Sequence, residues 1–167
     1  MSKPSFIDSQ KNGKHYQLNQ LIGEWEGSTK TWFEPDKLTD ESPWRGKMYP
    51  ILNGRFIAHE YHGSLQGKPF EGFAIYGYDL SSDTFQCTWV DSFHMSTAMM
   101  FSEGKPVNNG FSVLGSYNVP GMNQRWGWRT EIEPVNENQI IITSYNISPQ
   151  GEEAKGIETI YHRIGGL

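Results

Sequence analysis

The segment Thr88–Thr97, with the sequence TWVDSFHMST, brings a carboxylate, a hydroxyl and an imidazole into one short stretch. Successive side chains of a β-strand point to opposite faces of the sheet. Ser92 and His94 would therefore share one face, while Asp91 would share the other face with Trp89. Because the three polar groups cannot meet as a local serine triad, the segment does not predict nucleophilic catalysis.

Asp91 is the residue of this segment that most needs an explanation. In DTFQCTWVDS, the face that ends in Trp89 and Asp91 also carries Phe85 and Cys87, so it is the more apolar face and we expect it to point inward. A buried aspartate is costly unless it is hydrogen-bonded or paired. Asp91 could accept hydrogen bonds at the strand end, anchor a polar group of a ligand, or act as a general base.

A second candidate carboxylate lies in RFIAHEYHG, residues 55–63. If the face that carries Glu60 points inward, Glu60 enters the interior together with His62. We take this arrangement as the prediction. In the opposite arrangement, the alternate residues of the same stretch point inward: Ile57, His59 and Tyr61.

The histidines and the single cysteine show no metal-binding spacing. His59 and His62 are three residues apart, so on a strand they face opposite ways, and the chain has neither an H-E-x-x-H motif nor a cysteine pair. Cys87 has no basic neighbour in sequence that would activate its thiol. We therefore predict no metal site and no cofactor. Haem binding by one histidine is kept as an alternative, with His94 and His162 as candidate ligands.

The elements that would position these residues are mainly strands. Tyr16 to Ile22 shows a helical spacing that Gly23 could end, and residues 1–13 are predicted to be a flexible leader. From residue 24 onward, short β-rich runs alternate with turn signals such as Asn53-Gly54. Ten strands are predicted: Glu24–Phe33, Trp44–Ile51, Arg55–Ser64, Pro69–Tyr78, Thr84–Asp91, His94–Glu103, Gly110–Asn118, Gln124–Glu133, Gln139–Ile147 and Glu152–Arg163.

Consecutive strands with short links form an antiparallel meander, and an open meander of this length would leave two unpaired edges. Closing into an up-and-down β-barrel removes both edges. Neither a repeat nor a change of composition divides the chain, so we predict one all-β domain over residues 14–167. A barrel of this size tends to enclose a cavity.

The composition of the chain limits the classes of partner that it can bind. The 167 residues carry a net charge of −5, and the 14 basic residues are scattered, which argues against nucleic acid and anionic membranes. There is no run of about 20 apolar residues and no secretory leader is visible, so with one cysteine we expect a cytoplasmic protein. Aromatic residues make up 14%, including six tryptophans, and such residues favour strands and also line pockets.

Several motifs resemble a known superfamily. LIGEWEG, at residues 21–27, resembles the G-x-W opening of the calycins, which include lipocalins and fatty-acid-binding proteins. The resemblance implies that a basic residue near the end of the barrel packs on the tryptophan, and here Arg163 and Trp25 are the matching pair. NGRF, PFEGFAIYGYD, TWVDS and the closing Tyr161–Arg163 are similar to an uncharacterised, mainly bacterial family of calycin-like domains. That family implies a barrel and brings no activity.

We therefore predict that the barrel interior binds a small, largely apolar or aromatic molecule. Apolar contacts are assigned to Trp89, Met99, Trp126 and Trp128, and polar contacts to Asp91, Glu60 and His62. One alternative is an enzyme that uses an interior carboxylate as general acid or base on a small lipid-like substrate. Another is a barrel with a solid core that binds other proteins. The oligomeric state stays open, a homodimer included.

Overall fold

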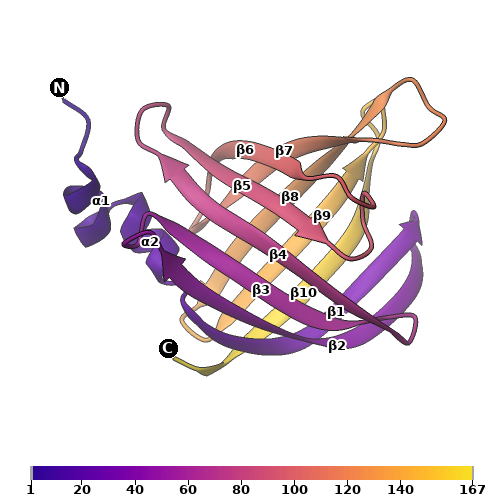
Figure 1. The fold of residues 1–167 in the computed structure, drawn as a ribbon, viewed down its shortest axis with the longest axis horizontal. Helices are drawn as coiled ribbons and strands as arrows, with labels where there is room; N and C mark the ends of the chain where they lie inside the picture. Colours follow the sequence, from indigo (N-terminus) through magenta and orange to yellow (C-terminus); the bar gives the residue numbers. More distant parts are fainter. Residues whose placement is uncertain (1, 167) are drawn as a thin grey trace.

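Ten strands form as the alternating runs and turn signals predict. The computed structural model describes residues 2–166. The strands are β1 Gly23–Glu34, β2 Lys37–Ile51, β3 Phe56–Leu65, β4 Lys68–Asp79, β5 Thr84–Asp91, β6 Met100–Val107, β7 Gly110–Asn118, β8 Arg125–Asn136, β9 Gln139–Ile147 and β10 Glu153–Gly165. Each strand pairs antiparallel with its neighbours in sequence, and β1 also pairs with β10 (Figure 1). The predicted up-and-down barrel is confirmed.

Two strands begin more than one residue away from their predicted starts. β2 begins at Lys37 rather than near Trp44, because Pro35 and the positive φ of Asp36 turn the chain directly from β1 into β2. β6 begins at Met100 rather than at His94. The residues before it, 92–99, form a loop that we call the β5–β6 loop.

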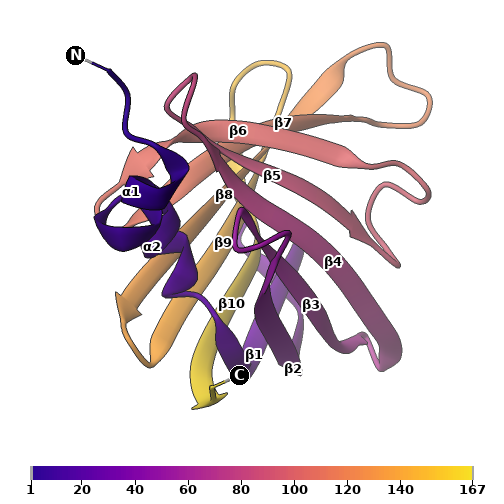
Figure 2. The same cartoon turned by 60° about the vertical axis from the view of Figure 1, so that its left-hand side comes forward.

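Two short helices precede the barrel, α1 Phe6–Asn12 and α2 Lys14–Asn19, and both lie at one end of it (Figure 2). α1 begins within the stretch for which a flexible leader is predicted. Its start is a capping box, in which the Ser5 side chain accepts from the Asp8 amide and the Asp8 carboxylate accepts from the Ser5 amide. Neither helix in residues 2–166 is long and apolar enough to cross a membrane.

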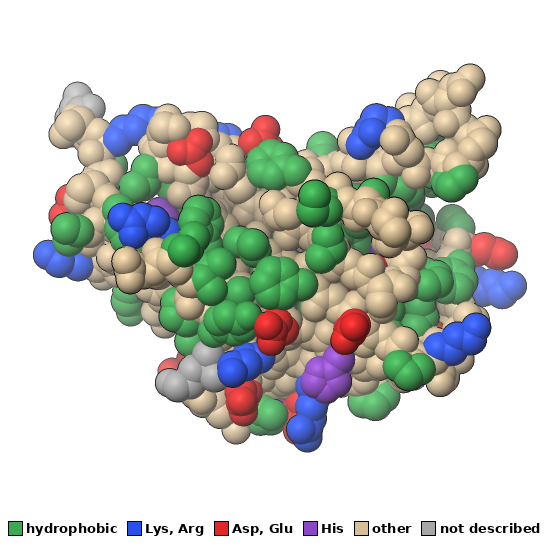
Figure 3. Space-filling view, viewed as in Figure 1, with side chains coloured by type: hydrophobic (Ala, Val, Ile, Leu, Met, Phe, Trp, Pro, Cys, Tyr) green, Lys and Arg blue, Asp and Glu red, His purple; other side chains and the backbone are tan. Residues whose placement is uncertain are grey.

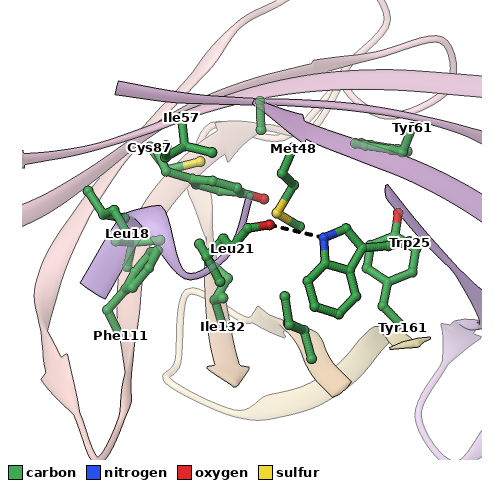
Figure 4. Packing of buried hydrophobic residues seen from close by; sticks show 14 of the residues in the cluster. Leu18, Leu21, Trp25, Met48, Ile57, Tyr61, Cys87, Phe111, Ile132 and Tyr161 are labelled. Atoms are coloured by element: carbon green, nitrogen blue, oxygen red, sulfur yellow. Dashed lines mark hydrogen bonds between the residues drawn. The ribbon is translucent and has the colours of Figure 1, made fainter. Parts of the chain in front are cut away.

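The barrel end next to the helices, here called the helix end, is filled by side chains. Leu18 and Leu21 enter this end and pack into the main core cluster, which contains Met48, Ile57 and Ile132 (Figure 4). The Trp25 indole N–H donates to the Leu21 carbonyl oxygen at 3.0 Å, which ties the chain after α2 to the first strand. Any space for a ligand inside the barrel therefore lies toward the opposite end, here called the mouth, where β1 and β5 end and β6 begins.

Candidate functional site

A cavity of about 240 Å³ opens at the mouth. Its floor and walls come from the ends of several strands, and its roof comes from the β5–β6 loop. We call it the mouth cavity. Its main lining residues are Trp89, Phe93, His94, Met100, Tyr117 and Trp128.

Aromatic pairs define the shape of the mouth cavity. Trp89 and Trp128 stack with ring centroids 5.6 Å apart and an interplanar angle of 13°. Phe33, at the end of β1, stacks on Phe93 of the β5–β6 loop at 5.7 Å and 15°. Both phenylalanines are about half exposed. The second pair therefore joins the loop to the opposite wall and narrows the entrance.

Below the mouth cavity lies a smaller space of about 60 Å³, here called the inner chamber. The two spaces share Trp89, Met100 and Trp128 as lining residues. The inner chamber is lined by hydroxyl groups as well as aromatic rings, and it also contains the ring of His59. Hydroxyl groups and an imidazole thus lie next to the mouth cavity, separated from it by these three shared side chains.

His59 is held between two tyrosines. Its Nδ1 atom lies 2.9 Å from the Tyr76 hydroxyl, and its Nε2 atom lies 3.2 Å from the Tyr161 hydroxyl. Burial lowers the pKa of His59 to about 3, so the ring is neutral at physiological pH. The Trp89 indole N–H donates to the Tyr61 hydroxyl at 2.6 Å, and the Tyr61 ring lies 4.9 Å from the His59 ring.

Asp91 organises the β5–β6 loop. Its Oδ1 atom accepts from the backbone amides of Phe93 and His94, and its Oδ2 atom lies 2.6 Å from Nδ1 of the His94 ring. The Asp91 side chain has no solvent exposure. Both carboxylate oxygens of Asp91 therefore have partners.

Ser92 ties the loop to β4, because its amide donates to the Glu71 carbonyl and its hydroxyl accepts from the Glu71 amide.

Only some of the predicted site residues meet at the mouth cavity. Trp89 and Trp128 stack there, whereas Asp91 acts on the loop that covers it. Trp126 lines a neighbouring groove, which shares Trp32, Phe33 and Asn146 with the mouth cavity.

The predicted inward face of β3 is wrong. Glu60 and His62 are exposed, and the Tyr49 hydroxyl donates to Glu60 on the outside of the barrel at 2.7 Å. Figure 3 shows acidic and histidine side chains on the surface of the face that carries β3 and β4. The opposite set points inward, Ile57, His59 and Tyr61. An inward Glu60 would be a buried carboxylate, which is costly, whereas the His59 ring is neutral and hydrogen-bonded.

Met99 is also misplaced by the prediction. Its side chain is 76% exposed, whereas Met100 is buried and lines both spaces. The β5–β6 loop contains two residues with positive φ, Met95 and Ser96, which break the strand alternation that places Met99 inward. The pairing resumes with Trp89 opposite Met100. The loop therefore places Met100 inside the barrel, instead of Met99 as the strand alternation predicts.

Trp25 and Arg163, the pair implied by the calycin resemblance, lie in contact at the helix end. The Arg163 guanidinium carbon is 4.2 Å from the centroid of the Trp25 ring. The guanidinium also donates to the carbonyl oxygens of Gln20, Ile22 and Glu137. The arginine therefore closes this end of the barrel, away from the mouth.

The two candidate haem ligands occupy different surroundings. His162 is exposed on β10, and His94 uses Nδ1 on Asp91. Among residues 2–166, no three histidine, cysteine, aspartate or glutamate residues are grouped so that they could hold a metal ion.

The predicted site does not include the residues of the inner chamber, above all His59, Tyr61, Tyr76 and Tyr161, although an inward His59 and Tyr61 form the alternative arrangement of β3. The sequence does contain one indication of the correct face of β3. Turning Ile57, His59 and Tyr61 inward buries larger side chains and leaves the Glu60 carboxylate in water. The partners of His59 on β4 and β10 are far away in sequence, so no local pattern indicates them.

The sequence model of the DUF1579 family, described as a protein of unknown function, matches residues 10–163, so the chain belongs to this family. Membership of an uncharacterised barrel family, as predicted, is thereby confirmed. A search of curated proteins found no relative.

Solved structures share the fold. Rv2717c from M. tuberculosis is 10% identical, with a TM-score of 0.62 over 89% of this chain and 95% of that chain. The S-type phycobiliprotein lyase CPES from Guillardia theta is 11% identical, with a TM-score of 0.59 over 96% and 98%. At these identities the likeness extends to the barrel alone.

Proposed function

We propose that this member of the DUF1579 family binds a small, largely apolar or aromatic molecule at the mouth of its barrel. The observation that carries the proposal is the mouth cavity, which is walled by the stacked Trp89 and Trp128 and adjoins a chamber that carries several hydroxyl groups. Ligand sites are typically concave and mostly apolar, with a few placed polar groups that fix orientation.

The size of the cavity limits the ligand. Sites for drug-sized molecules measure roughly 300–1,000 Å³, and the mouth cavity, at about 240 Å³, lies just below that range. A molecule with one or two fused rings suits this space. Flat rings would stack on the indoles, and Met100 would adapt to their outline because its side chain is flexible and polarisable.

A titration with 2-isopropylnaphthalene tests the proposal. This hydrocarbon has about 13 non-hydrogen atoms, and a Kd of about 10 µM would need only ~0.5 kcal/mol per atom. We expect saturable binding at about that Kd, measured by equilibrium dialysis and by a change in tryptophan emission. An absence of saturable binding would contradict the proposal.

Two variants locate the bound probe. A Cβ atom built on Gly156 lies 3.2 Å from both the Trp128 ring and the Asn146 amide nitrogen, so Gly156→Leu fills the mouth cavity and should weaken binding at least about tenfold. Phe101→Ala is the control, because it removes a 55% exposed ring from outside the barrel, and it should leave the Kd unchanged. If Phe101→Ala weakens binding and Gly156→Leu does not, the probe binds on the outer surface of the barrel.

The enzyme alternative has less support. Its two candidate bases were Glu60, which lies outside the barrel, and Asp91, whose oxygens already accept hydrogen bonds from the loop. A general base needs to reach the proton that it removes. Binding is therefore the better-supported function.

A further inference from the structure

The inner chamber carries several hydroxyl groups and an imidazole among apolar side chains, yet no Asp, Glu, Lys or Arg side chain lines it. Its lining residues include three tyrosines, two serines and two threonines. Its volume of about 60 Å³ can hold a few water-sized groups. The chamber is thus large enough for one polar end of a ligand whose rings occupy the mouth cavity.

The protonation of the His59 ring determines which hydrogen bonds the chamber can offer to a ligand. A neutral imidazole has one N–H donor and one acceptor nitrogen. One of Tyr76 and Tyr161 must therefore donate to His59, and the other must accept from it. The accepting tyrosine keeps its own O–H hydrogen, for which residues 2–166 provide no second hydrogen-bond partner.

Tyr61 provides a second free hydrogen. An indole N–H can only donate, so the Tyr61 hydroxyl accepts from Trp89 and its own hydrogen remains unused. No other side-chain hydrogen bond involves this hydroxyl within the described part of the chain. Tyr61 is buried, lines the inner chamber and is joined to an indole that also walls the mouth cavity.

The surroundings favour an uncharged acceptor over an anion. No cation lines the chamber, and the buried His59 is neutral. Burial raises the pKa of the Tyr61 hydroxyl well above its ordinary value, and the negative charge of Asp91 raises it further. A carboxylate placed here would lose its hydration and would also be repelled by Asp91.

We infer that the ligand is an uncharged aromatic carbonyl compound whose oxygen enters the inner chamber and accepts hydrogen bonds from Tyr61 and from whichever of Tyr76 and Tyr161 has the free hydrogen. This inference rests on the proposed function, because the rings of the same molecule occupy the mouth cavity. The inner chamber then selects among the flat molecules that the mouth cavity admits.

Three naphthalenes of matched size test the inference: 2-acetylnaphthalene, 2-isopropylnaphthalene and 2-naphthoate. Equilibrium dialysis at pH 7 gives the three dissociation constants for the wild type, Tyr61→Phe, Tyr76→Phe, Tyr161→Phe and Tyr117→Phe. Tyr117→Phe is the matched control, because the Tyr117 hydroxyl lies at the mouth cavity but already donates to Asn146. The hydrocarbon reports whether each variant keeps its binding cavity.

We expect the naphthoate to bind at least about tenfold more weakly than the ketone. Tyr61→Phe should lower the affinity for the ketone about fivefold relative to the hydrocarbon, which is the size of one ordinary hydrogen bond. Tyr161→Phe should do the same if Tyr161 carries the free hydrogen, and otherwise Tyr76→Phe should. Tyr117→Phe should leave the ratio of the two affinities unchanged.

The infrared carbonyl band of bound 2-acetylnaphthalene gives a second measurement. Hydrogen bonds lower its frequency, so the band should lie at a higher frequency in Tyr61→Phe than in the wild type. The inference would be overturned if the naphthoate bound more tightly than the ketone. It would also be overturned if none of the three substitutions Tyr61→Phe, Tyr76→Phe and Tyr161→Phe changed the ketone-to-hydrocarbon affinity ratio or the carbonyl band. In both cases saturable binding of the hydrocarbon would still uphold the proposed function. If the hydrocarbon also fails to bind, the proposed function is wrong as well, and the inference falls with it.

Discussion

At the scale of single residues, His59 makes the stability of the barrel depend on pH. Its pKa is about 3 in the folded protein and about 6.5 in an unfolded chain. Between these values the unfolded chain binds a proton that the folded protein does not, so the free energy of unfolding falls as the pH falls below 6.5. From pH 7 to pH 5 this one group should cost about 2 kcal/mol.

His59→Gln should flatten this dependence. The amide can still bond to the tyrosines, but it does not titrate, so the loss between pH 7 and pH 5 should be about 2 kcal/mol smaller than in the wild type. Urea unfolding at the two pH values measures it. His15, whose pKa burial and Arg55 also lower, contributes equally to both proteins. His62→Gln removes an exposed imidazole and should behave like the wild type. An unchanged slope in His59→Gln would show that His59 is not kept neutral.

At the scale of elements, the β5–β6 loop depends on one carboxylate. Asp91→Ala removes the acceptor of the Phe93 and His94 amides and the partner of the His94 ring. We expect these two amides to exchange with deuterium at least about tenfold faster, because hydrogen-bonded amides exchange only when the bond opens. Asp91→Asn keeps an acceptor oxygen and should have a smaller effect. NMR-detected hydrogen exchange measures both.

The control lies at the other end of the same strand pair. Asp79 accepts from Ser81 and Ser82 in the β4–β5 turn. Asp79→Ala should speed exchange in that turn and leave the Phe93 and His94 amides as they are. Equal exchange of these two amides in Asp91→Ala and the wild type would mean that other contacts, such as the stacking of Phe33 on Phe93, hold the loop.

The elements show what could be predicted from the sequence and why the rest could not. Strand alternation is local, so the inward direction of Trp89 and the existence of ten strands follow from short windows. The inward face of β3 depends on partners in β4 and β10, which a short window does not contain. Met100 rather than Met99 points inward because Met95 and Ser96 in the loop have positive φ. Neither of them is a glycine, so the sequence does not indicate this turn. The fold was therefore easier to predict than the site.

At the scale of the whole molecule, the barrel closes along one seam between the two ends of the chain. β1 pairs with β10 from Glu24–Gly165 to Thr31–Ile157. Every other strand pairing joins neighbours in sequence. If the seam opens, β1 and β10 both become edge strands with unpaired backbone groups. The seam therefore decides whether the strands form a closed barrel or an open sheet that can pair with other chains.

Two glycines on this seam allow a matched test. A Cβ atom built on Gly27 would lie 1.7 Å from the Ile160 carbonyl oxygen and 3.2 Å from Cα of Tyr161, both backbone atoms of β10. A Cβ on Gly165 would meet nothing closer than a carboxylate oxygen of Glu24, at 3.6 Å. Gly27→Ala must push the two strands apart, whereas Gly165→Ala makes an ordinary contact.

We expect Gly27→Ala to lose about 3 kcal/mol or more of its free energy of unfolding, and Gly165→Ala to stay within about 0.5 kcal/mol of the wild type. Urea unfolding measures the first effect. Size-exclusion chromatography should then show larger species for Gly27→Ala than for the wild type or Gly165→Ala, because the exposed edges of an opened barrel pair between molecules. A Gly27→Ala protein that is as stable and as compact as Gly165→Ala would mean that the seam can shift to accept a side chain, and the closure of the barrel would then be less rigid than the close approach of β1 and β10 implies.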